Sequence, residues 1–148
     1  MPYGSTAERR AKWPYEPERI HRWEQGPSSA TVMVLSPHVV VTEVIGSFVS
    51  DAIDTVKPPI QQLMARSGAA HVFWDAEGLE SHDGPVRDEF VGLFRNNRSQ
   101  WAGLHVLFRS ALIGMTVGAV GLLFRGALKG HRDRDSFRKA IDAALASE

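Results

Sequence analysis

The chain has 148 residues and no cysteine. This absence excludes disulfide scaffolds, thiolate zinc sites and cysteine nucleophiles. An excess of charge of one sign is also missing, because 17 Lys and Arg residues balance 17 Asp and Glu residues. A neutral chain does not have the basic excess of a nucleic-acid-binding protein, so no nucleic-acid partner is expected. Neutrality also leaves little self-repulsion to oppose self-association.

Long hydrophobic runs are scarce. Residues 1–12 hold no apolar leader and carry charges at Glu8, Arg9, Arg10 and Lys12, so a cytoplasmic location is expected. One long apolar run, SALIGMTVGAVGLLF, fills residues 110–124 between two arginines. As a helix it would be about 22 Å long, shorter than the ~30 Å hydrocarbon core of a bilayer. The run therefore predicts a buried helix, and contact with a membrane surface is the less favoured alternative.

The chain length suits one domain with one hydrophobic core. Residues 1–18 form an N-terminal tail whose periodicity is interrupted by Pro2, Gly4, Pro14 and Pro17. Residues 19–148 form the domain. We expect Trp13 and Tyr15 to hold the tail against it.

The first half of the domain alternates between strand and helix patterns. Residues 20–24 suit an edge strand, and the β-branched runs 31–35 and 38–45 suit an antiparallel hairpin that ends at Gly46. Residues 47–66 have helical apolar spacing at Phe48, Ala52, Val56, Ile60 and Leu63. Because Pro58-Pro59 removes backbone donors, a kink or two short helices are expected there.

The second half continues the alternation. A buried strand at 70–74 ends in Asp75, a polar loop follows at 76–83, and a helix then begins with Asp83 or Gly84 as its cap and Pro85 in its first turn. A strand at 104–108 precedes the apolar helix. Residues 126–134 hold a short last strand or a loop, and Asp135 caps a final helix with an inner face of Phe137, Ile141, Ala144 and Leu145.

This order of elements predicts an α/β fold, with a mixed and mainly parallel sheet, an N-terminal hairpin and about four helices. Two strings, HVVVTEVIGSF at 38–48 and FWDAEGLESHD at 73–83, are similar to segments of STAS domains, the sulfate-transporter and anti-sigma-factor-antagonist family. The resemblance covers residues 30–146 and is nearest to a divergent bacterial branch.

The resemblance implies a non-enzymatic module that binds partner proteins, or in some members nucleotides or small apolar ligands. It also implies a phosphorylated Ser or Thr at the start of the second helix, where phosphate meets the positive helix end. Here Gly84 occupies that position, and Ser81 is the nearest hydroxyl. The phosphorylation switch is therefore not expected in its usual form.

One candidate binding surface is a polar rim. Asp75 and Arg109 each follow a predicted parallel strand, and ligands of open α/β sheets bind outside such strand ends. We expect a ligand or partner rim made of Asp75, Ser81, His82, Asp83, Arg87 and Arg109. In the alternative, Asp75 and Arg109 pair with each other or with loop amides.

Two catalytic or metal interpretations are weaker. Ser81-His82-Asp83 holds the residue types of a hydrolase triad, but consecutive side chains point apart, so a solvated loop and helix cap are favoured. His71 and His105 can approach each other on neighbouring strands and, with Asp75, suggest a metal site. Ordinary hydrogen-bond partners are favoured for them, and no metal or cofactor is expected.

The basic stretch from Arg125 to Arg134 is interpreted as a solvated loop.

The apolar helix is the second candidate surface, an interaction helix formed by Leu112, Gly114, Met115, Val117, Gly118, Val120 and Gly121. Gly114-x-x-x-Gly118 permits close packing, and the near absence of a polar side means that the outer face also needs a cover. That cover is a second copy, a partner protein, the N-terminal tail, an apolar ligand or a membrane surface.

Three functions remain open from the sequence. The favoured one is a STAS-like regulatory or protein-interaction domain, which binds a partner protein or forms a homodimer. The second is a small apolar ligand or lipid carrier, which a cavity of several hundred Å³ would support. The third is a hydrolase that uses Ser81 or His82.

Overall fold

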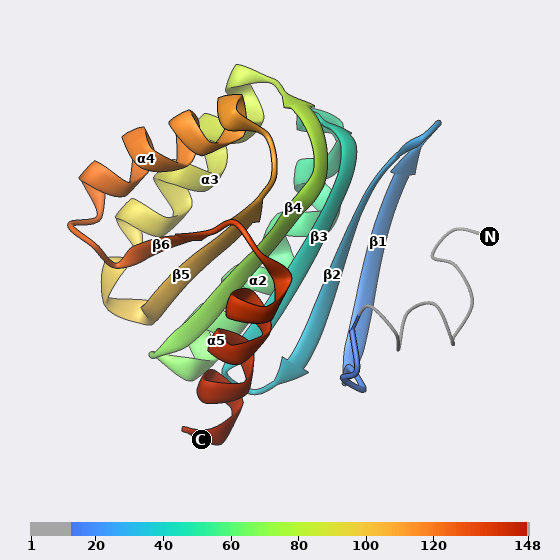
Figure 1. The fold of residues 1–148 in the computed structure, drawn as a ribbon. Coiled ribbons are helices and arrows are strands. Elements are labelled where there is room, and N and C mark those ends of the chain that lie inside the picture. The colour runs from blue at the N-terminus through green and yellow to red at the C-terminus, as the bar shows by residue number, and fades with distance from the viewer. Residues whose placement is uncertain (1–12, 148) are drawn as a thin grey trace.

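A six-stranded sheet is the centre of the computed structural model, which describes residues 13–147 (Figure 1). Its strands are β1 (Arg19–Gln25), β2 (Ser28–Ser36), β3 (Val39–Phe48), β4 (Ala70–His82), β5 (Trp101–Phe108) and β6 (Leu128–His131). They lie in the order of the chain: β1, β2 and β3 are antiparallel, and β3 to β6 are parallel. The predicted mixed sheet with an N-terminal hairpin is confirmed, and so is the edge strand.

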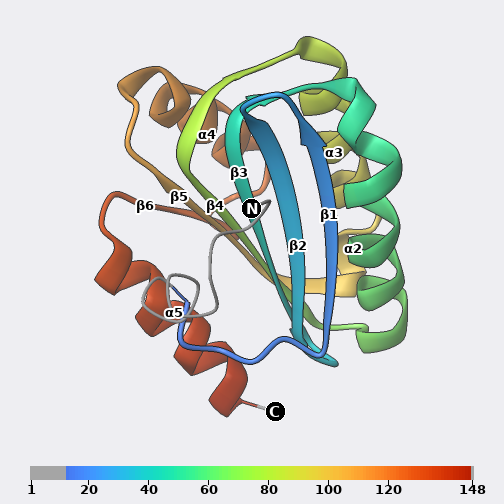
Figure 2. The same ribbon diagram turned by 90° about the vertical axis from the view of Figure 1, so that its right-hand side faces the viewer.

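Helices cover both faces of this sheet. They are α2 (Ile53–Ser67), α3 (Gly84–Asn96), α4 (Ala111–Leu123) and α5 (Arg134–Ala146), with short 3₁₀ turns at η1 (Ser50–Ala52) and η2 (Arg98–Gln100). Each parallel strand is added on the same side of the one before it, so crossovers of one hand place α2, α3 and α4 on one face. The last helix, α5, lies on the opposite face (Figure 2).

Two hydrophobic cores follow from the alternation of side chains along the strands. In β4, Val72 and Trp74 face the α2–α3 side, whereas Phe73 packs toward α5. Trp13 joins the α5 core with 2 % of its surface exposed and meets the ring of Phe137 edge-on at 5.8 Å.

Tyr15 adds a polar contact to the same helix, because its hydroxyl donates to Asp142 Oδ1 at 2.6 Å. Burial, helped by that carboxylate, raises the pKa of Tyr15 to about 12, so the hydroxyl stays a donor. Trp13 and Tyr15 therefore hold the segment before β1 against the domain, as predicted.

The hairpin and β4 extend further than predicted. β3 continues through Gly46 to Phe48, and β4 runs to His82 in place of the expected loop at 76–83. The two strands stay paired as far as Phe48 and His82, with two irregularities in register. In this extension Glu80 and Ser81 are exposed, whereas Phe48 is buried in the core. Phe48 consequently belongs to a strand and not to a helix stripe.

The helix boundaries also differ in detail. α2 begins at Ile53 and continues as one helix through Pro58 and Pro59, so the expectation of two short helices is wrong. α5 is capped by Asp133 rather than Asp135, because the Asp133 Oδ1 accepts a 2.8 Å bond from the backbone N–H of Ser136. The start of α3 is as predicted: Asp83 accepts from the N–H of Val86 at 2.8 Å.

Close packing of α4 occurs at one of the two predicted glycines. A Cβ on Gly114 would lie 2.6 Å from Cε2 of Phe108, the last residue of β5. At Gly118, apart from its chain neighbours and the backbone of α4 itself, no atom of the described residues lies within 4 Å of the same position. The Gly114-x-x-x-Gly118 pair therefore fits α4 against the sheet only through Gly114, and Gly118 lies on the outer side.

This difference predicts opposite effects for two alanine substitutions. Gly118→Ala should stabilise the protein by up to about 1 kcal/mol, because alanine favours helix and meets open space. Gly114→Ala should destabilise it by about 1 kcal/mol or more, because the methyl group must displace the Phe108 ring. Urea unfolding of both variants measures the two changes. Equal stabilisation by both would contradict the tight approach of α4 to β5.

Candidate functional site

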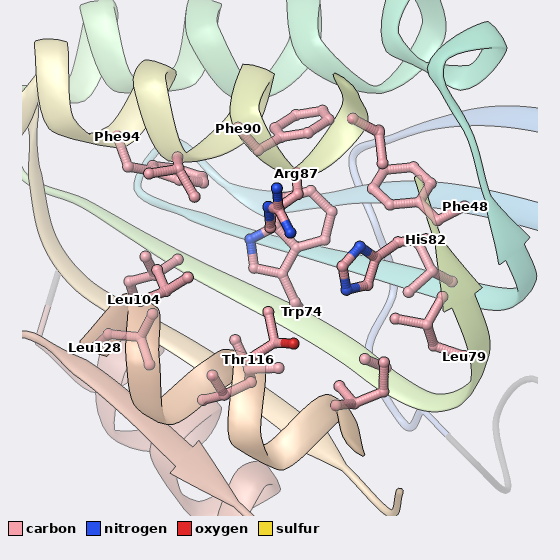
Figure 3. A pocket seen from close by; sticks show the side chains of 18 of the residues that line it. Phe48, Trp74, Leu79, His82, Arg87, Phe90, Phe94, Leu104, Thr116 and Leu128 are labelled. Atoms are coloured by element: carbon pink, nitrogen blue, oxygen red, sulfur yellow. The ribbon is translucent and has the colours of Figure 1, made fainter. Parts of the chain in front are cut away.

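An apolar cavity of about 150 Å³ lies between α3, α4 and the face of the sheet that they cover (Figure 3). Its walls include Val44 of β3, Trp74 of β4, Phe90 of α3, Leu104 of β5 and Val117 of α4. The space is smaller than the several hundred Å³ expected of a ligand carrier. It matches the size of an apolar cavity that accepts a benzene ring.

Aromatic rings make one wall of the cavity rigid. Trp74 meets Phe90 edge-on with ring centroids 5.1 Å apart, and Phe48 stacks on Phe90 at 5.7 Å. Helical spacing brings Phe90 and Phe94 of α3 to the same side, and both contact Trp74. The opposite wall is α4, which contributes aliphatic side chains such as Val117 and Val120.

Polar side chains line this cavity at few points. Arg87 comes from the first turn of α3, His82 from the end of β4, and Thr116 from α4. Figure 3 shows Arg87 and His82 beside Trp74, with Thr116 across the space from them. Arg87 Nε also lies 3.2 Å from Asp88 Oδ1, in a pair whose side chains are largely exposed.

The predicted rim divides into two groups. Ser81, His82, Asp83 and Arg87 gather where β4 passes into α3. Asp75 does not end its strand as expected: it lies inside β4 and is completely buried. Arg109 follows the end of β5, as predicted.

The residues of the proposed triad do not converge. The Ser81 hydroxyl lies 2.9 Å from the hydroxyl of Ser47. The Asp83 carboxylate accepts backbone bonds from Val86 and Ser50, and these hold its pKa below the usual range. The contacts of these side chains thus belong to a strand pair and a helix cap, and they give no support to a hydrolase.

Asp75 and Arg109 instead meet in an ion-pair cluster at the start of α5. Arg134 Nη2 lies 3.2 Å from Asp75 Oδ2 and 2.6 Å from Glu77 Oε1. Arg109 reaches the other oxygen of Glu77 at 3.3 Å. The hydrogen bond from Arg134 lowers the pKa of Glu77. Arg134 therefore joins α5 to β4, and its interpretation as a solvated residue is wrong.

Histidines form a second polar group on the same face. His105 Nδ1 lies 2.9 Å from His131 Nε2, and His131 Nδ1 lies 2.8 Å from the Ser136 hydroxyl. Phe73 stacks on His105 at 4.6 Å. Burial, followed by the charges of His131, Lys129 and His71, lowers the pKa of His105 to about 4.

These contacts give no support to the suggested metal site. Asp75 pairs with Arg134 at 3.2 Å. In residues 13–147, no three His, Asp or Glu side chains are grouped so that they could hold a metal ion. His71 and His105 do come close, because both rings lie against Gly103.

The outer face of α4 is apolar and exposed. Leu112, Met115 and Leu122 have exposed fractions of 68, 72 and 82 %, and Leu123 has 55 %. In α4, which the structure describes in full, only Ile113 is buried. Residues 13–147 therefore do not supply the cover that the sequence led us to expect. Within that range, no helix is both long and apolar enough to cross a membrane.

The predicted interaction helix therefore faces solvent on one side and the cavity on the other. Leu112, Met115 and Gly118 lie on the exposed side, whereas Val117 and Val120 line the cavity. Two further exposed leucines, at positions 122 and 123, belong to the same apolar run but were not among the predicted residues. The aromatic wall of the cavity was not predicted either, because it depends on how three elements pack. Its rings are Phe48, Trp74, Phe90 and Phe94.

Comparisons with known proteins support the fold. No family model and no curated protein matches the chain. One similar solved structure is an uncharacterised protein of the DUF3478 family with a SpoIIAA-like fold from Shewanella loihica PV-4. It has a TM-score of 0.58 and 11 % sequence identity, and the match covers 85 % of this chain and 92 % of that one. The STAS-like fold is confirmed, and at this identity the likeness shows the fold alone.

The half-buried histidine pair predicts a pH-dependent stability. The folded state holds His105 neutral down to about pH 4, whereas an unfolded histidine takes up a proton near its ordinary pKa of 6.5. Protons therefore favour the unfolded state in this window, and stability should fall by roughly 2 kcal/mol between about pH 7 and pH 5. His105→Gln should flatten this slope, as measured by urea unfolding at several pH values. His21→Gln, on the edge strand β1, is the control, and an unchanged slope in His105→Gln would refute the assignment.

Proposed function

We propose that this chain is a non-enzymatic interaction domain of STAS-like type, which binds a second protein molecule through the outer face of α4. The observation that carries the proposal is the exposed apolar stripe of Leu112, Met115 and Leu122 on a folded domain. Soluble monomers rarely leave contiguous apolar surface of this kind uncovered, so such a patch marks an interaction site.

The spacing of the stripe favours another helix as its partner. Leu112, Met115, Ala119 and Leu122 follow one another at intervals of three, four and three residues, which is the pattern of a helix–helix seam. Gly118 and Ala119 are small residues in the middle of the exposed face, where they allow a second backbone to come close.

A second copy of the chain supplies a helix with this same pattern. In a two-fold symmetric pair, α4 of each copy would cover α4 of the other through the same surface patch. Each large apolar side chain that becomes fully buried contributes about 1.5–3 kcal/mol. The zero formal net charge adds no repulsion between the copies.

The cavity favours a second candidate function, the binding of a small apolar ligand. Its walls are apolar with a few polar groups at defined positions, which is the usual composition of a ligand site. The cavity and the outer stripe lie on different sides of α4, so the two functions can be tested separately.

Self-association can be tested on the intact chain by analytical ultracentrifugation. At tens of micromolar the wild-type protein should sediment as a dimer, and Leu122→Glu should sediment as a monomer because a charge then lies in the seam. Ile20→Glu is the matched control: Ile20 is also exposed, at 44 %, but it lies on β1. A monomeric wild-type protein, or equal loss of the dimer in both variants, would contradict the α4 interface.

A further inference from the structure

We propose that the cavity between α3 and α4 binds a small monocarboxylate with an apolar tail, whose carboxylate is held by Arg87. The inference rests on the second candidate function, ligand binding, and adds the chemical class of the ligand. It depends on three features: the size of the cavity, the arrangement of its polar groups, and the weak pairing of Arg87.

The cavity fixes the size of the tail. A space of about 150 Å³ holds a group the size of one benzene ring or a short alkyl chain. Phe90, Trp74 and Val117 surround it with carbon atoms, so a polar group buried at that depth would lack partners. The buried part of the ligand is therefore a short hydrocarbon group.

Arg87 determines the charge of the other end. The described residues that line the cavity include Arg87 but no Asp or Glu. A guanidinium group favours a carboxylate, because two parallel N–H bonds match its two oxygens. His82 lies beside the same opening and offers a further hydrogen-bonding nitrogen (Figure 3).

The existing partner of Arg87 does not prevent such binding. Asp88 lies 3.2 Å from Arg87 Nε, but its side chain is 72 % exposed. Exposed ion pairs of this kind contribute little to stability, so a ligand carboxylate can replace Asp88 at the guanidinium. A single negative charge fits best, because Asp88 lies beside the guanidinium and would repel a dianion more strongly.

The test compares three probes with the same six-carbon chain: hexanoate, 1-hexanol and hexylamine. Binding is followed by NMR through the indole N–H of Trp74 and the methyl groups of Val117 and Val120. Hexanoate should bind about tenfold more tightly than 1-hexanol, the usual gain from one charge-assisted hydrogen bond. Hexylamine should bind most weakly, because its ammonium group meets Arg87.

Single substitutions test whether Arg87 causes the preference for hexanoate over 1-hexanol. Arg87→Gln should bring hexanoate down to the affinity of 1-hexanol, and Asp88→Asn should strengthen hexanoate binding alone. Arg95→Gln is the control, because Arg95 is exposed on the same helix and lies outside the cavity lining. Val117→Phe should fill the cavity and weaken both probes, and Val120→Met is the milder version if that variant does not fold.

The outcomes test the carboxylate assignment and the ligand-binding function separately. If 1-hexanol binds as well as hexanoate, or if the preference survives in Arg87→Gln, the carboxylate assignment is wrong and the apolar site remains. If none of the three probes shifts the Trp74 or valine signals of the wild-type protein, the ligand-binding function itself is overturned. Self-association through α4 is unaffected by either result, because it uses the outer face.

Discussion

The regular order of the sheet is the constraint on which the other features depend. Each crossover from β3 to β6 steps to the next strand in the same direction, so its handedness assigns α2, α3 and α4 to one face. α4 is the last of these helices and covers the edge formed by β5 and β6. It has α3 on one side and no further helix of residues 13–147 beyond it. Both the cavity and the exposed stripe of Leu112, Met115 and Leu122 follow from this position.

The same constraint leaves the opposite face of the sheet without α2, α3 or α4. With three helices placed on one side, α5 and the segment around Trp13 must cover the other. Apolar packing is supplemented there by partly buried polar contacts, in which Arg134 binds Asp75 and Glu77, and His105 contacts His131. Removing Arg134 would take an ion-pair partner from the carboxylate of Asp75, which is completely buried, and such a loss is strongly destabilising. These contacts join the start of α5 to the sheet.

Local patterns in the sequence sufficed for much of this fold. Three elements could each be predicted from a few neighbouring residues. The hairpin follows from its β-branched runs, α3 from its Asp83 cap, and α4 from its apolar run. The end of β4 was missed because its sequence, EGLESH at 77–82, is mostly polar and reads as a loop, although its backbone stays paired with β3. The partner of Asp75 is Arg134, 59 residues away, and no local pattern joins them. The cavity could not be predicted for the same reason, because it forms only where α3 packs beside α4.

The composition of α4 connects the two proposed binding events. A helix with one apolar side would need shelter on that side alone, but α4 has apolar residues toward the cavity, such as Val117, and toward solvent, such as Met115. Gly114 lies close to Phe108 near the first turn of α4, and just past the other end of the helix Phe124 is buried and meets the ring of Trp101 edge-on at 5.4 Å. α4 is therefore held against the sheet near both of its ends. The cavity and the outer stripe therefore belong to one helix but use different side chains of it, so a substitution at Val117 acts on the cavity and one at Leu122 acts on the outer face.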